Sequence, residues 1–255
     1  MEKRIIAYGD GKTGYLEGDT LVKAFDSEYS KADVLNEALN HAMIEQTGLK
    51  VPLLLGVQER GEEWVIIKKY IPGRTFDEVL SSEPEKTDEY MELFVKTQKL
   101  IHSKRAPLLR RQWDRLSDKI SASSLEATQR FSLLERIREM PRMKKVCHGD
   151  FNPSNVILTD GGDVYVIDWS HATQGNAAAD AALTYLLFVL DGKNELAEKY
   201  LNVFCSSGTT KKEYIIKWLP IVAAAQSCKE QGERLELLLK IASDEIIGLP
   251  IREKE

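Results

Sequence analysis

The chain has 255 residues, of which 43% are hydrophobic and 29% charged, and its formal net charge is −5. This length suffices for a sizeable core in two lobes, and the composition is that of an ordinary globular protein. With this negative charge nothing argues for a nucleic-acid partner, so none is expected, and no apolar stretch is long enough to span a membrane.

The first 70 residues predict a small sheet with one helix. Short β-rich runs predict strands at residues 5–8, 20–25, 51–57 and 63–70. Apolar residues at helical spacing predict a helix over residues 30–47, which Gly48 ends.

A glycine-rich string, GDGKTG, occupies residues 9–14. A dinucleotide-binding fold would need a helix to open at these glycines, but residues 15–20 predict a strand end and a turn. A Walker A loop would need its first glycine where Ile6 stands. Two interpretations remain: a plain hairpin loop, or a loop whose glycines let backbone N–H groups approach phosphate oxygens.

Helices dominate the prediction for the rest of the chain. A capping box at Thr75 and Glu78 predicts a helix start, and an amphipathic helix is expected over residues 84–103. Two further helices, about 108–121 and 124–139, are rich in Arg and Lys, which is typical of a solvated face. Four more helices are expected at about residues 177–190, 193–206, 210–228 and 230–247.

The string HGDFNPSN at residues 148–155, followed by Asp168 at the end of the run VYVID, is the most informative motif. Phosphoryl transfer needs a carboxylate to orient and deprotonate the attacking hydroxyl, and hard oxygen ligands to hold Mg²⁺ against the polyphosphate. A loop Asp, an Asn five residues later and a second Asp after a hairpin supply these groups. The spacing therefore predicts Asp150 as the base, and Asn155 and Asp168 as magnesium ligands.

The segment between Asn155 and Asp168 predicts how the two ligands meet. Two short apolar runs, 156–158 and 164–167, flank the turn sequence DGGD. This pattern is typical of a β-hairpin, which returns the chain to its start. Asn155 and Asp168 are therefore expected side by side.

The combination of His-Gly-Asp-x-x-x-x-Asn with Ile-Asp-Trp resembles the aminoglycoside phosphotransferase and choline kinase family, whose members are relatives of protein kinases. Gly175 and Asp180 match that family's later Gly…Asp pattern. Protein kinases usually carry Arg where this chain has Gly149, and Phe-Gly where it has Trp169 and Ser170. Both departures favour the branch that acts on small molecules.

The resemblance implies an α+β, bilobal protein-kinase-like fold, with an N-terminal antiparallel sheet carrying one helix and a mainly helical C-terminal lobe. It implies a nucleotide-binding lobe at residues 1–70 and a catalytic and substrate-binding lobe at residues 71–255. Asp180 would be a buried carboxylate that accepts backbone N–H groups of the catalytic loop.

The resemblance also implies a nucleotide site. Lys23 would clamp the phosphates and pair with Glu37, with Glu45 as a less favoured partner. Backbone groups near Lys68, Tyr70 and Ile71 would bind a purine edge. The glycine string would cover the phosphates through Gly9, Gly11, Lys12, Thr13 and Gly14.

The implied activity is transfer of the γ-phosphate of ATP, or of GTP, with Mg²⁺, to a hydroxyl of a small molecule such as an aminoglycoside, an amino alcohol or a sugar. A protein kinase is a weaker alternative, because residues 168–180 are too short for an activation segment and lack Ala-Pro-Glu. A non-catalytic nucleotide-binding protein commonly lacks a catalytic Asp, Lys or metal ligand, whereas all are present here.

Three scattered cysteines, Cys147, Cys205 and Cys228, form no metal-binding spacing. Together with an N-terminus that has no secretory apolar segment, they indicate a reducing compartment. We therefore expect a cytoplasmic protein.

Overall fold

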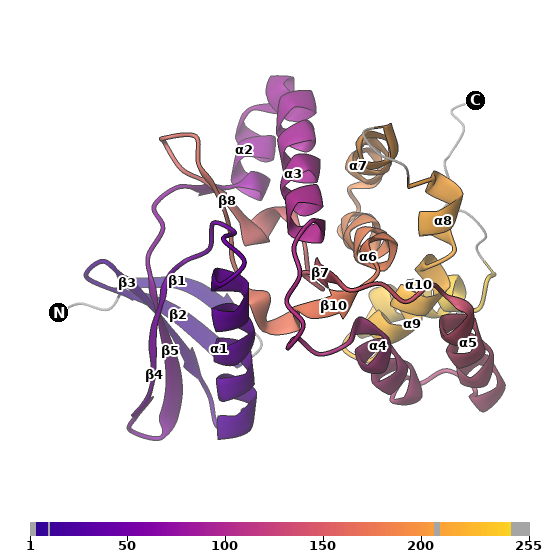
Figure 1. The fold of residues 1–255 in the computed structure, drawn as a ribbon, viewed down its shortest axis with the longest axis horizontal. Coiled ribbons are helices and arrows are strands. Elements are labelled where there is room, and N and C mark those ends of the chain that lie inside the picture. Colours follow the sequence, from indigo (N-terminus) through magenta and orange to yellow (C-terminus); the bar gives the residue numbers. More distant parts are fainter. Residues whose placement is uncertain (1–3, 10, 207–209, 246–255) are drawn as a thin grey trace. The chain divides into compact units, whose positions relative to one another are not determined.

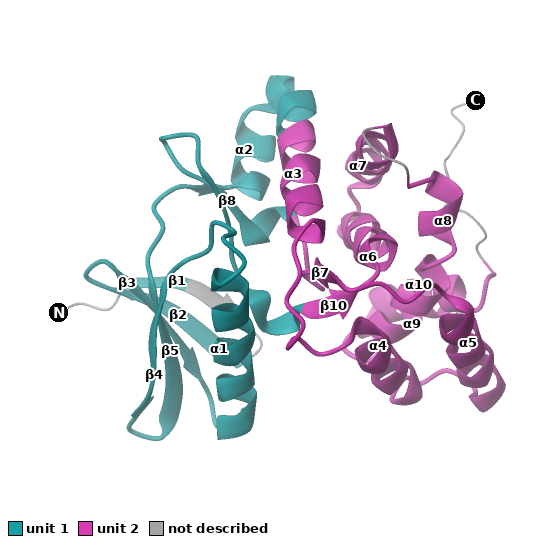
Figure 2. Ribbon diagram, in the orientation of Figure 1, with its two compact units in different colours: residues 1–90, 153–172 teal, residues 91–152, 173–255 magenta. Residues whose placement is uncertain are grey.

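A computed structural model describes residues 4–9, 11–206 and 210–245 of the chain (Figure 1). The chain divides into two compact units (Figure 2): unit 1 comprises Met1–Tyr90 and Pro153–Ala172, and unit 2 comprises Met91–Asn152 and Thr173–Glu255. Each unit is therefore built from two separate stretches of sequence. The lobes expected at residues 1–70 and 71–255 stay a prediction.

Unit 1 contains a five-stranded antiparallel sheet in the order β1-β2-β3-β5-β4. Its strands are β1 (Arg4–Gly9), β2 (Lys12–Glu17), β3 (Thr20–Phe25), β4 (Leu54–Arg60) and β5 (Glu63–Lys69). β2 begins inside the glycine string, because Gly11 adopts a left-handed backbone with φ +66° and turns the chain at once. The string is therefore a tight turn followed by a strand that pairs with β3, and its residue Asp10 lies outside the described part of the chain.

Helix α1 (Lys31–Glu45) lies against one side of this sheet (Figure 1). A capping box starts the helix: Ser30 accepts from the backbone N–H of Asp33, and Asp33 accepts from that of Ser30. Val34 and Ala38 are buried in one cluster with Phe25 and Ile66 of the sheet. Burial of these side chains holds the helix on the sheet.

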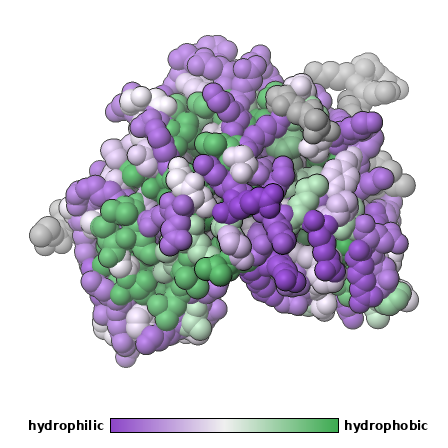
Figure 3. Space-filling view, viewed as in Figure 1, coloured by the Kyte–Doolittle hydropathy of each residue, from purple (hydrophilic) through white to green (hydrophobic). Residues whose placement is uncertain are grey.

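The outer face of α1 keeps apolar side chains in solvent. Leu35 and Leu39, one turn apart, are 44% and 54% exposed. Figure 3 shows hydrophobic side chains gathered over this part of unit 1.

A second sheet in unit 1 has the order β6-β8-β9. Its strands are β6 (Arg74–Thr75), β8 (Val156–Leu158) and β9 (Val164–Val166), of which β8 and β9 form the predicted hairpin. Helix α2 (Phe76–Ser82) starts at the predicted capping box of Thr75 and Glu78. Gly73 allows β8 to approach, because a Cβ there would lie 2.5 Å from the backbone oxygen of Leu158.

Unit 2 is mainly helical. Its helices are α3 (Thr87–His102, which begins in unit 1), α4 (Gln112–Ser121), α5 (Ala127–Glu139), α6 (Ala177–Leu190), α7 (Asn194–Ser206), α8 (Lys212–Ile216), α9 (Leu219–Ser227) and α10 (Gly232–Ala242). Two short strands, β7 (Lys145–Cys147) and β10 (Thr173–Gly175), pair antiparallel. The aromatic rings of Phe94, Phe151, Phe188 and Tyr200 contact one another in its core. The α+β class predicted from the sequence, with a sheet first and helices after it, is confirmed.

Two helix predictions differ from the structure. The helix expected at residues 210–228 is divided into α8 and α9, and Pro220 stands in the first turn of α9, where the missing N–H of proline has no helical partner to lose. The helix expected at 230–247 ends at Ala242, and residues 246–247 lie outside the described chain. No described helix is both long and apolar enough to cross a lipid bilayer.

Candidate active site

Two carboxylates of unit 1 meet at Lys23. Its Nζ lies 2.7 Å from Oε1 of Glu37, a carboxylate that α1 holds in a buried position. Both carboxylate oxygens of Asp168 lie 3.5 Å from the same Nζ. Burial would lower the pKa of Lys23, but the negative charges of Asp168 and Glu37 outweigh it and raise this pKa above its ordinary value. Lys23 therefore stays protonated and positively charged.

Asp168 is held ionised and partly open to solvent. Its backbone is left-handed, with φ 56°, and its side chain is 36% exposed and accepts the N–H of Ser170 at 3.4 Å. Burial opposes ionisation, but the charges of Lys23 and Lys68 hold the pKa of Asp168 well below its usual range. The carboxylate can therefore still accept a further cation from solvent.

Asn155 and Asp168 lie at neighbouring ends of the β8–β9 hairpin. Val156 pairs with Val166, and the N–H of Ile167 donates to the carbonyl of Asn155 at 2.9 Å. An ionised carboxylate next to a carboxamide is a donor set of hard oxygens, which fits Mg²⁺. The structure thus brings the two predicted ligands together, and their role stays a prediction.

The glycine string lies close to the same charges. The carbonyl of Gly11 accepts the N–H of Asp26 at 2.9 Å. Lys12 reaches to 3.5 Å from Oε2 of Glu37, and its Nζ lies 4.8 Å from the ring centroid of Tyr29. The side chain of Glu37 thus faces two cations, Lys12 and Lys23, from adjacent strands.

The segment that follows β5 was predicted to bind a purine edge through its backbone, and this role stays a prediction. The N–H of Lys69 donates to Leu53 and that of Tyr70 to Asp19, at 2.8 and 3.0 Å. Among the described residues, the backbone N–H of Ile71 has no such partner. Of the predicted hinge amides, that of Ile71 is the one available to a ligand.

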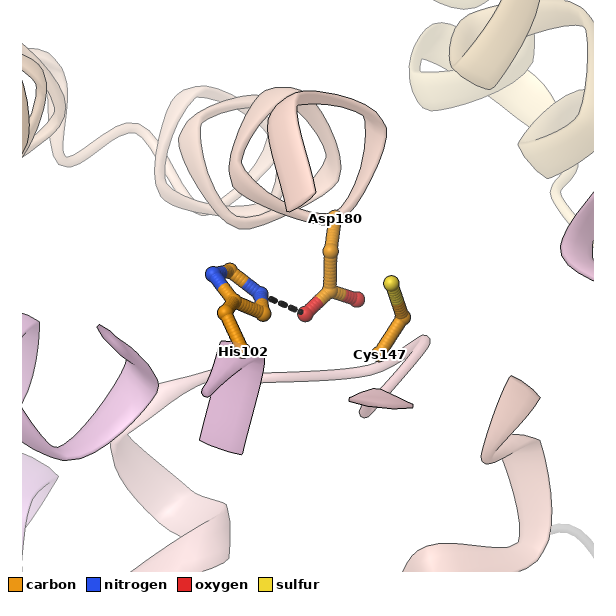
Figure 4. A group of neighbouring side chains, drawn as sticks. All are labelled: His102, Cys147 and Asp180. Atoms are coloured by element: carbon orange, nitrogen blue, oxygen red, sulfur yellow. Dashed lines mark hydrogen bonds and ion pairs between the residues drawn. The ribbon is translucent and has the colours of Figure 1, made fainter. Parts of the chain in front are cut away.

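In unit 2 a buried carboxylate braces the loop that carries Asp150. Asp180 on α6 accepts the backbone N–H of Gly149 at 2.8 Å and that of His148 at 3.2 Å. Nε2 of His102 lies 2.9 Å from the same carboxylate (Figure 4). Burial opposes the charge, but these hydrogen bonds and the field of His102 keep the pKa of Asp180 below its ordinary value.

Cys147 stands beside His102 and Asp180 (Figure 4), and the three ligand types could in principle hold a metal ion. Burial raises the pKa of Cys147 well above its usual range and so favours its thiol form. Both oxygens of Asp180 already accept loop N–H groups. Through these hydrogen bonds Asp180 acts as a structural brace for the loop.

Asp150 directly follows His148 and Gly149, the two residues whose backbone N–H groups bind Asp180. The side-chain amide of Asn152 donates to its backbone oxygen at 3.2 Å and to its carboxylate at 3.3 Å. These two hydrogen bonds from Asn152 restrain the orientation of the Asp150 side chain.

Residues 10–215 match the family model described as the phosphotransferase enzyme family. The chain belongs to this phosphotransferase family. No curated protein sequence matches the phosphotransferase.

Solved structures share its fold at low sequence identity. An aminoglycoside phosphotransferase, APH(4)-Ia, in a ternary complex with ADP and hygromycin B, is 13% identical, with a TM-score of 0.71 over 96% of this chain and 93% of that one. An aminoglycoside-3'-phosphotransferase of type VIII is 17% identical, with a TM-score of 0.64 over 88% and 93%. A choline/ethanolamine kinase family protein from Mesorhizobium loti is 16% identical, with a TM-score of 0.61 over 96% and 81%. These similarities confirm the predicted kinase-like fold.

Sequence reasoning missed one charged side chain of this phosphotransferase. Lys68 was expected to contribute only its backbone, yet its side chain is 5% exposed. Burial lowers its pKa below the ordinary value, while Glu37 opposes this and Lys23 adds to it. The strand period was the available signal, because Lys68 shares the face of β5 that carries Ile66 toward α1.

Proposed function

We propose that this protein transfers the γ-phosphoryl group of a nucleoside triphosphate, ATP or GTP, to a hydroxyl of a small molecule. The observation that carries the proposal is the Lys23–Glu37–Asp168 constellation in unit 1, found in a chain whose unit 2 presents a braced Asp150. Phosphoryl transfer depends mainly on positioning and on charge stabilisation, which these groups supply. Sugars, amino alcohols and aminoglycosides all offer a suitable hydroxyl.

Each residue has one role in this proposal. Lys23, held by Glu37, binds phosphate oxygens, and the glycine string with Lys12 lies over the triphosphate. The N–H of Ile71 donates to the purine edge. Asn155 and Asp168 would hold Mg²⁺, which neutralises polyphosphate charge when bound. Asp150 accepts the proton of the acceptor hydroxyl and orients its oxygen.

Free cysteines support a cytoplasmic location within the same proposal. Cys147, Cys205 and Cys228 are all unpaired with one another. Thiols persist in this state in a reducing compartment.

The decisive test is Asp150→Ala. Acceptor-dependent ADP release should fall by on the order of 10²–10⁴, the usual contribution of a positioned base, while Mg·ATP affinity remains nearly unchanged. Asp160→Ala, at an exposed turn between β8 and β9, is the matched control and should retain full turnover. Full activity in Asp150→Ala would remove Asp150 from the mechanism.

A further inference from the structure

A group of cations lies on helix α4 of unit 2. Arg115 and Lys119 are one helical turn apart, so they share one face of the helix, and both are half-buried. Lys229 follows the end of α9, a helix that packs against α4. The basic residues of this helix were expected to form a solvated face, which does not hold for Arg115 and Lys119.

Helix α4 is fixed next to the loop that carries Asp150. Strand β7 leads directly into that loop, and β10 pairs with β7. The N–H of Gln174 on β10 donates to the carbonyl of Arg110 at 2.9 Å, just before α4 begins. Oε1 of Gln112, in the first turn of α4, accepts the N–H of Asn176 at 2.8 Å. These bonds place the cation-bearing helix against the support of the catalytic loop.

The cations act on one another and on Asp150. Burial, with the neighbouring charges of Arg115 and Lys229, lowers the pKa of Lys119 to about 8. Burial, with the charge of Arg110, lowers the pKa of Arg115 to about 10. In both cases Asp150 is the carboxylate whose field partly offsets the effect. The positive charges of Arg115 and Lys119 are thus partly buried and interact electrostatically with Asp150.

The side chain of Lys119 has no hydrogen bond or ion pair to any described residue. Its neighbour along the helix, Asp118, pairs instead with Arg110. Because partial burial and neighbouring positive charges both disfavour the charged form of Lys119, an anion bound beside it would stabilise that form.

Resting on the proposed function, we propose that the phosphate acceptor is an anionic hydroxyl compound, whose phosphate or carboxylate group is bound by Arg115 and Lys119 while Asp150 receives its hydroxyl. The exposed Lys229 adds positive charge near Lys119. A polycationic acceptor of the aminoglycoside type is repelled by the positive charges of Arg115 and Lys119 and is therefore disfavoured.

The test is a panel of matched acceptors at saturating Mg·ATP. Glycerol is compared with glycerol 3-phosphate, glycerate and 3-amino-1,2-propanediol, and glucose with glucose 6-phosphate, glucuronate and glucosamine, with acceptor-dependent ADP release as the readout. An anionic member should exceed its neutral counterpart in kcat/KM by about tenfold or more, the effect of one charge-assisted contact. The phosphate and carboxylate arms show which anion is preferred.

Variants test whether Lys119 on α4 and the neighbouring Lys229 cause the preference. Lys119→Gln should raise KM for the anionic acceptor about tenfold and change a neutral acceptor less than about twofold. Lys229→Gln, at an exposed position, should show the same pattern at about threefold. Lys119→Glu should invert the preference toward the amine. Lys96→Gln, which removes an exposed lysine of α3, is the matched control and should change nothing.

Distinct outcomes overturn distinct claims. When no compound of any charge is phosphorylated, the proposed function itself fails, and the acceptor class falls with it. When a neutral or amine acceptor is phosphorylated as well as its anionic counterpart, only the acceptor class fails. It also fails when Lys119→Gln slows every acceptor equally through kcat, because the cations then act on the transferred phosphoryl group.

Discussion

His41 shows how the charged cluster of unit 1 affects a neutral neighbour. The side chain is fully buried, and its Nε2 lies 2.6 Å from the carbonyl oxygen of Pro52. A carbonyl only accepts, so Nε2 carries a proton. Burial, aided by the positive charge of Lys68, lowers the pKa of His41 to about 4.

This shift predicts a loss of stability in mild acid. Between about pH 6.5 and pH 4 the unfolded chain binds a proton at His41 that the folded chain refuses, so the free energy of unfolding falls as the pH falls. The full effect is at most roughly 3 kcal/mol. His41→Gln retains an N–H donor for Pro52 but does not titrate.

Urea unfolding of both proteins at pH 7, 5.5 and 4 measures the difference. The His41→Gln protein should lose less stability across this range than the natural protein. Parallel pH profiles for the two would mean that His41 is not the group responsible.

The sequence predicted the residues whose chemistry follows a motif. Asp150, Asn155 and Asp168 came from spacing, and Lys23 with Glu37 came from family resemblance; the structure brings all but Asp150 together within unit 1. Lys68 and Lys119 could not be assigned in this way. The strand period only puts Lys68 on the same face of β5 as Ile66. Whether a lysine on such a face or on a helix is buried depends on what packs against it in three dimensions.

At the scale of elements, Gly175 sets how closely α4 approaches β10. A Cβ at Gly175 would lie 2.3 Å from Oε1 of Gln112 and 2.4 Å from its Cβ. Gln112 cannot rotate away without losing the N–H of Asn176. The glycine of the Gly…Asp pattern is therefore required by packing rather than by a turn.

Gly175→Ala should accordingly destabilise the fold by about 1–3 kcal/mol, the usual cost of overpacking. Gly56→Ala is the matched control, because a Cβ at Gly56 in β4 meets no atom within 4 Å and its backbone is not left-handed. Thermal or urea unfolding compares the two variants. Equal stabilities would show that α4 moves aside without penalty.

Element types followed from periodicity more reliably than element ends did. The helix expected at residues 30–47 is α1, and the hairpin after Asn155 is β8 with β9. The start of β2 at Lys12 was missed because it depends on the left-handed turn at Gly11. The break before α9 was missed because Pro220 stands inside an apolar run that continues the helical pattern.

At the scale of the whole molecule, nucleotide binding should stabilise the fold through linkage. A ligand at 100 times its Kd adds about 2.7 kcal/mol to the free energy of unfolding. If Asp168 holds Mg²⁺, the gain from ATP should be larger with Mg²⁺ than without it, and Asp168→Asn should abolish that difference.

Melting temperatures with ATP, with and without Mg²⁺, test this. Asp163→Asn removes a carboxylate of the same hairpin whose partner is the exposed Lys50, and it should keep the Mg²⁺ dependence. Retention of the dependence in Asp168→Asn would assign the metal to other residues.

Neither unit is a continuous piece of chain, and this has a consequence for synthesis. Unit 1 closes only when residues 153–172 join residues 1–90, through the β6–β8 pairing and the N–H of Val166 on the carbonyl of Lys50. A ribosome adds about 5–20 residues per second, so it needs about 4–16 s to pass from residue 90 to residue 172. Throughout that interval the carboxylate of Glu37 is present to balance the positive charges of Lys23 and Lys68, but the carboxylate of Asp168 is not. We expect the nascent N-terminal sheet to stay incompletely folded until the hairpin emerges.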